Sequence, residues 1–116
     1  MSNERLVYLD NNATTRISPE VIEAMLPCLT EHWGNPSSAY ELANAPARMI
    51  ETAREQVAKL IGANPRNIVF TSCGTESNNA AIQSALHCNP TKRHVITTAV
   101  EHSANIKFCR QLEKRG

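Results

Sequence analysis

The sequence predicts an α/β protein with a parallel strand–helix–strand core and flanking helices. Two short apolar runs, at 68–70 and 95–98, enclose a helical stretch from 75 to about 88. Such a crossover joins parallel strands and is strongly right-handed. Parallel strands are normally buried on both faces in a larger sheet, yet only two good strands are visible. The sequence therefore predicts one incomplete domain, the first part of a longer α/β protein.

This domain is expected to have two parts, an N-terminal segment with two helices (1–62) and the strand–helix–strand–helix part (63–116). In the first part, Ser18 followed by Pro19 is typical of an N-cap and a first helical residue. Apolar residues then recur at four-residue spacing: Val21, Met25 and Leu29. A helix of about three turns is predicted, and Pro27 should disturb its last turn.

A turn cluster at 34–38 separates this helix from a longer one. One face of the longer helix is apolar: Met49, Ile50, Ala53, Val57, Leu60 and Ile61. Gly62 is a natural stop, since glycine readily adopts the left-handed conformation that ends helices. The opposite face is charged and is expected to be solvated with spaced ion pairs: Arg48, Glu51, Arg54, Glu55 and Lys59.

The most informative stretch is 71–79, Thr-Ser-Cys-Gly-Thr-Glu-Ser-Asn-Asn, between the first predicted strand and the third helix. The first backbone N–H groups of a helix have no partner within it, and the helix dipole adds positive potential there. Gly74 would allow close approach of a phosphate, and Thr75 and Ser77 could add hydroxyl donors. The pattern indicates a phosphate-bearing ligand; the alternative is an ordinary helix start without a ligand.

Composition narrows the function classes. The 116 residues are 41% hydrophobic, with a net charge of +1 and no run of like charge, which gives no support to nucleic-acid or membrane-surface binding. No apolar run approaches the roughly 20 residues of a membrane helix. No secretory leader is visible, so a cytoplasmic setting is expected.

The four cysteines never form C-x-x-C and are expected to be free thiols, those at 28, 88 and 109 buried. Residues 10–12 are interpreted as an ordered loop rather than a metal site.

Four segments taken together, 8–15, 34–38, 70–79 and 97–104, resemble those of the cysteine desulfurases of the NifS type. These enzymes belong to the class V aminotransferase group of pyridoxal-phosphate enzymes. The resemblance implies the large domain of a fold-type I pyridoxal-phosphate-dependent transferase. The sequence Ser-Cys-Gly-Thr at 72–75 resembles the sequences of the family branch linked to nitrogen fixation.

The resemblance also implies residue roles. Gly74 and Thr75 match the turn that holds the phosphate of pyridoxal 5′-phosphate, and His102 matches the histidine that stacks on the cofactor ring and assists proton transfer. Both groups follow predicted parallel strands at their carboxyl ends, where ligands of open α/β sheets bind. The alternative for His102 is a capping or surface histidine at a helix start.

The implied reaction takes sulfur from L-cysteine, releases L-alanine and forms an enzyme persulfide. That sulfur serves iron–sulfur cluster assembly through a scaffold or another acceptor protein. Relatives are homodimers. The lysine that binds the cofactor and the nucleophilic cysteine are not matched by any residue here, so the 116 residues alone are expected to be inactive. Cys73 is interpreted as a small packing residue rather than as the persulfide carrier.

Two positions depart from the family pattern, Tyr40 in place of histidine and Ala43 in place of glycine, and they leave the local loop shape open. Three alternatives also stay open: another class V enzyme such as a selenocysteine lyase or an aminotransferase, a nucleotide-binding domain, and a non-catalytic truncated remnant. The nucleotide-binding alternative is disfavoured because the glycine-rich motifs G-x-G-x-x-G and G-x-x-x-x-G-K-[ST] are missing.

Overall fold

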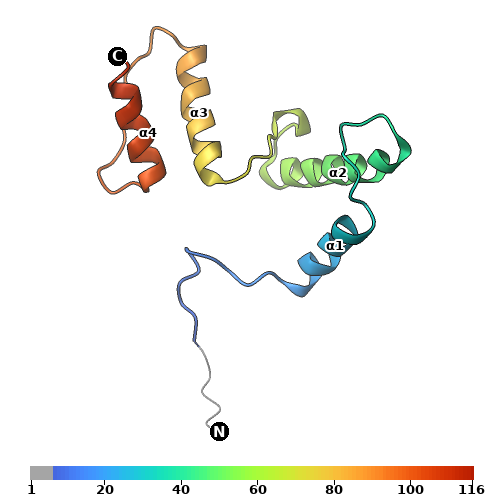
Figure 1. Cartoon of the computed structure of the whole chain (residues 1–116). Helices are drawn as coiled ribbons and strands as arrows, with labels where there is room; N and C mark the ends of the chain where they lie inside the picture. Colours follow the sequence, from blue (N-terminus) through green and yellow to red (C-terminus); the bar gives the residue numbers. More distant parts are fainter. Residues whose placement is uncertain (1–6) are drawn as a thin grey trace. The chain divides into compact units, whose positions relative to one another are not determined.

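The computed structural model describes residues 7–116, which fall into two compact units that meet in sequence between Ile68 and Val69. The first unit contains helices α1 and α2 and two short 3₁₀ helices, and the second contains α3 and α4 (Figure 1). Their bounds in chain order are α1 Pro19–Thr30, η1 Glu41–Ala43, α2 Asn44–Ile61, η2 Pro65–Asn67, α3 Gly74–Cys88 and α4 Ser103–Glu113.

Helix α1 begins as predicted. The Ser18 side chain accepts a hydrogen bond from the Val21 N–H at 3.4 Å, and Pro19 is the first helical residue. The expectation that Pro27 disturbs the last turn is wrong, because the helix continues to Thr30. Proline removes only the bond that its own N–H would make. Its carbonyl still accepts from the Glu31 N–H at 2.9 Å, which closes the last turn.

Helix α2 ends as predicted at Gly62, which has a positive φ of 66° and donates its N–H to the last turn of the helix. Its charged face contains the expected Arg54–Glu51 ion pair, at 3.1 Å. Arg54 is less solvated than expected, since only 23% of its side chain is exposed. The guanidinium also donates to the carbonyl of Ile68. Arg54 thereby ties the end of the first unit to the middle of α2.

The turn at 34–38 packs closely against η1. A Cβ added to Gly34 would lie 2.5 Å from the carbonyl oxygen of Leu42 and 2.9 Å from its Cγ. Only a residue without a side chain therefore fits there. Ala43, one of the two departures from the family pattern, lies beside this contact in sequence and is 1% exposed. The other departure, Tyr40, is exposed and precedes η1.

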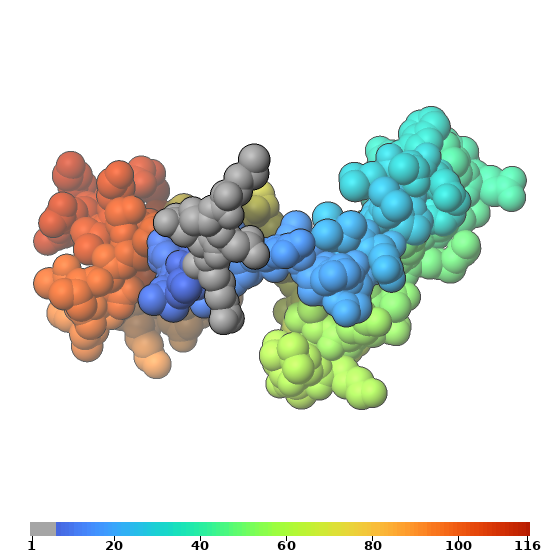
Figure 2. Space-filling model, turned by 90° about the horizontal axis from the view of Figure 1, so that it is seen from below, coloured from blue at the N-terminus to red at the C-terminus, as the bar shows by residue number. Residues whose placement is uncertain are grey.

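In the second unit, α3 and α4 lie side by side and run in the same direction, because the connection between them returns along the pair (Figure 1). The space-filling view shows the atoms of α4 and of this connection against one another (Figure 2). A hydrogen bond of 3.0 Å from the Asn78 side-chain amide to Oδ1 of Asn105 joins the two helices. Both helices consequently begin at the same end of the unit.

The two predicted strands are not formed, so the expected parallel strand–helix–strand core is wrong for residues 7–116 of this structure. A strand is stabilised by hydrogen bonds to a neighbouring strand, and the runs at 68–70 and 95–98 do not pair with each other. Their apolar side chains are correspondingly open, with Val69 77% and Ile96 89% exposed. The buried residues of the described part are few and small: Gly34, Ala43, Pro46 and Ala58. None of the described helices has the length and apolarity to cross a membrane.

The contact at Gly34 predicts a contrast between two glycine substitutions. Gly34→Ala should destabilise the protein by about 2 kcal/mol, because the new methyl group meets backbone atoms that cannot move aside cheaply. Gly74→Ala should be tolerated, since no atom lies within 4 Å of a Cβ added there. Urea unfolding of both variants checks this, and equal unfolding midpoints would show that the close contact at Gly34 is not maintained in solution.

Candidate functional site

The N-terminus of α3 presents backbone donors to solvent. The N–H groups of Gly74, Thr75 and Glu76 donate to no backbone carbonyl among residues 7–116, because the first backbone bond of the helix comes from Ser77 to the carbonyl of Cys73. The N–H groups of Thr75 and Glu76 face the Cys73 sulfur and lower the pKa of its thiol. The space in front of Gly74 is open. Three amide groups at the positive end of a helix dipole form a donor set that suits an anion such as a phosphate.

The turn before these amides is held by Glu76, which sequence reasoning missed. Its Oε2 accepts from the Ser72 N–H at 2.7 Å and from the Ser72 hydroxyl at 2.6 Å. These two bonds, the side-chain one first, lower the pKa of the Glu76 carboxyl. The usual capping pattern has a hydroxyl or acidic residue three positions before the glutamate, where this chain has Cys73. The bonds from Ser72 span four residues, so that pattern did not predict them.

The hydroxyl groups of the turn have different surroundings. Oγ of Ser77 lies 2.6 Å from Oγ1 of Thr71 and 3.3 Å from the carbonyl oxygen of Cys73. The Ser77 hydroxyl, expected to be a ligand donor, is therefore already engaged in the turn. The Thr75 hydroxyl lies near the Cys73 thiol and affects its pKa. Thr75 is accordingly the better placed of the two predicted hydroxyl donors.

Cys73 is exposed at the N-cap of α3, which corrects the expectation that it is a packing residue. The pKa of its thiol is lowered, first by the backbone N–H of Glu76, then by the Ser72 hydroxyl and by Thr75. The positive end of a helix favours the thiolate in the same way. Cys28 and Cys88 are also exposed and Cys109 is half-buried, so the expectation of three buried thiols is wrong.

His102 is the N-cap of α4. Its Nδ1 accepts a hydrogen bond from the Ala104 N–H at 3.2 Å. The capping alternative is thus confirmed. Because Nδ1 uses its lone pair in this bond, the neutral ring carries its proton on Nε2. The imidazole is exposed, so its faces remain available, and the predicted stacking on a cofactor ring remains a prediction.

The two candidate groups lie at the same end of the second unit. Asn78 is one helical turn after Gly74 and Thr75, Asn105 is three residues after His102, and these two asparagines bond to each other at 3.0 Å. The donors of α3 and the imidazole at the start of α4 are therefore at neighbouring helix N-termini.

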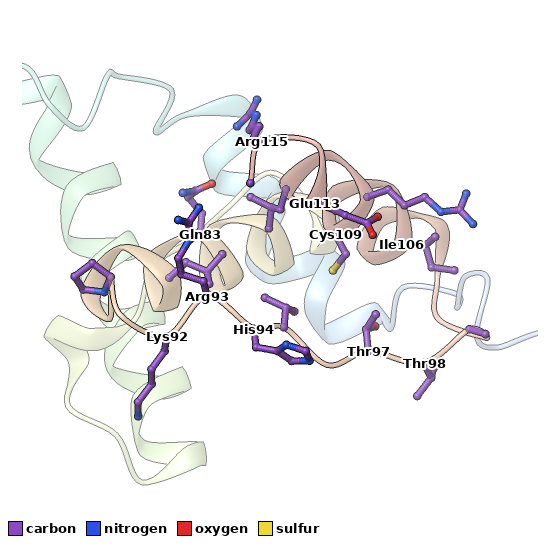
Figure 3. Close-up of a pocket in the computed structure, with 17 residues that line it drawn as sticks. Gln83, Lys92, Arg93, His94, Thr97, Thr98, Ile106, Cys109, Glu113 and Arg115 are labelled. Carbon is purple, nitrogen blue, oxygen red and sulfur yellow. The ribbon is translucent and has the colours of Figure 1, made fainter.

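A groove in this unit lies away from these two helix starts. It has a volume of about 870 Å³ and is lined by α4, by the connection before it and by two residues of α3 (Figure 3). Lys92, Arg93 and Arg115 lie along it, but Gly74, Thr75 and His102 do not. Among residues 7–116 there is no group of three or more His, Cys, Asp or Glu that could hold a metal ion.

Comparison with known proteins now identifies the family. Residues 7–116 match the model of the aminotransferase class-V family. The chain belongs to that family. Over 111 residues it is 56% identical to a cysteine desulfurase of Trichormus azollae, covering 96% of this chain and 28% of the relative. It is 50% identical over 111 residues to the cysteine desulfurase NifS of Azotobacter vinelandii, covering 95% and 28%.

Two solved structures are similar to this chain. A NifS-like protein matches 95% of the chain with a TM-score of 0.87 at 41% identity, over 30% of its own length. A structure titled SspA in complex with cysteine matches 94% of the chain with a TM-score of 0.85 at 37% identity, over 32% of its own length. The chain spans less than a third of these relatives, so it covers only part of what they contain.

The surroundings of Cys73 predict its pH-dependent reactivity. In a variant with serine at the other three cysteine positions, Cys73 should be alkylated by iodoacetamide at a pH below the ordinary range of a thiol, because a lowered pKa means more thiolate at a given pH. Ser72→Ala removes one of the causes and should move the pH–rate profile to higher pH. Identical profiles for the two proteins would show that the Ser72 hydroxyl does not act on this thiol.

Proposed function

We propose that the chain is the N-terminal part of a pyridoxal-phosphate-dependent cysteine desulfurase with the fold-type I large domain. The enzyme would transfer the sulfur of L-cysteine to an enzyme thiolate: the carbon–sulfur bond breaks, a sulfur–sulfur bond forms, and the carbon gains a proton to give L-alanine. The observation that carries this proposal is the open amide set at the start of α3 beside the His102 cap of α4, in a chain 56% identical to a curated cysteine desulfurase.

The donor set fits the cofactor. The N–H groups of Gly74, Thr75 and Glu76 would hold the phosphate, and the Thr75 hydroxyl would add a fourth donor. A phosphate of nearly two negative charges gains from the helix dipole at the same position. Residue 74 contributes only its backbone, which agrees with the open space in front of it. When bound, pyridoxal phosphate supplies the electron sink for breaking the carbon–sulfur bond.

His102 would act in two ways. Its flat ring offers a face for stacking on the pyridine ring, and its free nitrogen can hold or move a proton. Since Nδ1 accepts from Ala104, the proton would be exchanged at Nε2. The capping bond also restricts rotation of the ring, so the same interaction that begins α4 would orient the catalytic imidazole.

The two groups that make the reaction possible would lie outside these 116 residues. None of the lysines at 59, 92, 107 and 114 matches the family lysine that binds the cofactor, and we assign the persulfide to a cysteine other than Cys73. The chain by itself would accordingly be inactive. The complete enzyme would be a cytoplasmic homodimer that passes sulfur to an iron–sulfur scaffold or another acceptor protein, with a link to nitrogen fixation.

One observation favours L-cysteine over other amino acids as the substrate: a relative of 37% identity has been solved in complex with cysteine. The second candidate function is that of another class V enzyme, a selenocysteine lyase or an aminotransferase, which the same cofactor donors would serve. The products formed from L-cysteine by the full-length protein distinguish these candidates. Alanine with a protein persulfide supports the desulfurase, and transamination without sulfur release contradicts it.

Substitutions at the two candidate groups test the cofactor site in the full-length protein. Thr75→Val removes one phosphate donor and should weaken pyridoxal phosphate binding about tenfold, whereas His102→Ala should mainly lower kcat. Fluorescence titration of the apoprotein and alanine release measure the two effects. Asn89→Asp is a matched control at the other end of α3, where the Asn89 side chain bonds only to the Ala85 carbonyl. A Thr75→Val protein with unchanged affinity would argue against the proposed phosphate position.

A further inference from the structure

A chain of side-chain hydrogen bonds crosses the second unit next to the candidate site. The Asn78 amide donates to Oδ1 of Asn105 at 3.0 Å, and the Asn105 amide donates to Oε2 of Glu101 at 3.0 Å. Oε1 of Glu101 accepts from the Thr98 hydroxyl at 3.3 Å. Asn105 is the central member, since it bonds to α3 with its oxygen and to the segment before α4 with its nitrogen.

We propose that Asn105 is a positioning residue that fixes the imidazole of His102 relative to the phosphate donors at Gly74 and Thr75. This inference rests on the proposed function, because the spacing of these groups matters only if they bind the same cofactor. Asn105 does not touch the proposed cofactor position. It acts through its bonds to Asn78, on the helix that carries the donors, and to Glu101, the neighbour of His102 in sequence.

The chemistry of asparagine explains why this residue suits the task. An amide has an acceptor on one side and a donor on the other, so a single side chain can link a donor on α3 to a carboxylate before α4. Asn105 is the third residue of α4, half-buried, and both polar atoms of its side chain are bonded to other residues rather than to water.

The hydrogen bonds of Asn105 would set the distance between the His102 imidazole and the phosphate donors. The Asn105 N–H bonds to the carbonyl of His102 at 3.0 Å, so the backbone of His102 moves together with Asn105. Asn78 is likewise within one turn of Thr75. A shift of α4 along α3 would therefore change the gap between the imidazole and the phosphate donors, and small misplacements of catalytic groups cost much of their effect.

An introduced charge with a rescue substitution tests the proposal in the full-length protein. Asn105→Asp keeps the acceptor for Asn78 but places a carboxylate against Glu101, so affinity for pyridoxal phosphate should fall about tenfold. Adding Glu101→Gln restores a donor toward residue 105 and an acceptor toward Thr98, and affinity should return to within about threefold of wild type. Glu101→Gln alone and Asn89→Asp are controls that should bind like wild type.

Two further measurements separate positioning from folding. Asn78→Ala removes the same bond from α3 without adding charge and should weaken binding to a similar extent, which decides the matter if Asn105→Asp does not fold. Thermal unfolding of the apoproteins should be lowered no more in these variants than in Asn89→Asp, while the visible spectrum of the bound cofactor should shift.

Unchanged affinity in Asn78→Ala, or no recovery in the double variant, would overturn the positioning role. Wild-type protein that binds no pyridoxal phosphate would instead refute the proposed function, and this inference with it. If the wild-type protein binds pyridoxal phosphate and Asn105→Asp binds it with the same affinity, only the inference is refuted.

Discussion

Helices α3 and α4 begin at the same end of the second unit, and the hydrogen bond between Asn78 and Asn105 holds their first turns together. The positive ends of two helix dipoles therefore lie close to one another, and the first N–H groups of α3 lie at the same end as the His102 cap. Everything proposed about a ligand depends on this arrangement. If the two helices ran in opposite directions, the phosphate donors and the imidazole would be separated by the length of a helix.

The helices of this chain form from local sequence, which is why they could be predicted. An α-helix satisfies its own backbone hydrogen bonds, and its start and stop signals lie within a few residues. Ser18 with Pro19 begins α1, and Gly62 ends α2, as expected. The signal at Pro27 was overestimated, because a proline in the last turns deprives an exposed helix of one bond without preventing the bonds that follow.

The strand prediction was wrong because strands, unlike helices, depend on residues far away in the sequence. The runs at 68–70 and 95–98 have the composition of buried parallel strands, but a strand needs a neighbour to bond to, and they do not provide one for each other. Leu60, Ile96 and Val100 are more than four-fifths exposed, which gives the described residues a large apolar surface around a very small core. Soluble proteins rarely expose so much apolar surface unless it packs against something else.

In the candidate site, too, local features could be predicted and contacts between distant residues could not. The helix starts at Gly74 and His102 were predicted from local sequence, whereas the ligand roles of Gly74, Thr75 and His102 stay predictions. The bonds from Ser72 to Glu76 do not follow the usual capping pattern, since they span four residues, and the sequence did not indicate them. The links from Asn78 to Asn105 and from Asn105 to Glu101 could not be predicted, since they depend on how two helices pack. The engagement of Ser77 with Thr71 depends on the folded turn as well.

The central claim is that the phosphate of pyridoxal phosphate binds at the start of α3. A crystal structure of the full-length protein with this cofactor tests it most directly. The account predicts phosphate oxygens within hydrogen-bonding distance of the amides of Gly74, Thr75 and Glu76, with the His102 ring parallel to the pyridine ring. A phosphate bound to other residues, with these amides facing solvent or protein, would contradict it.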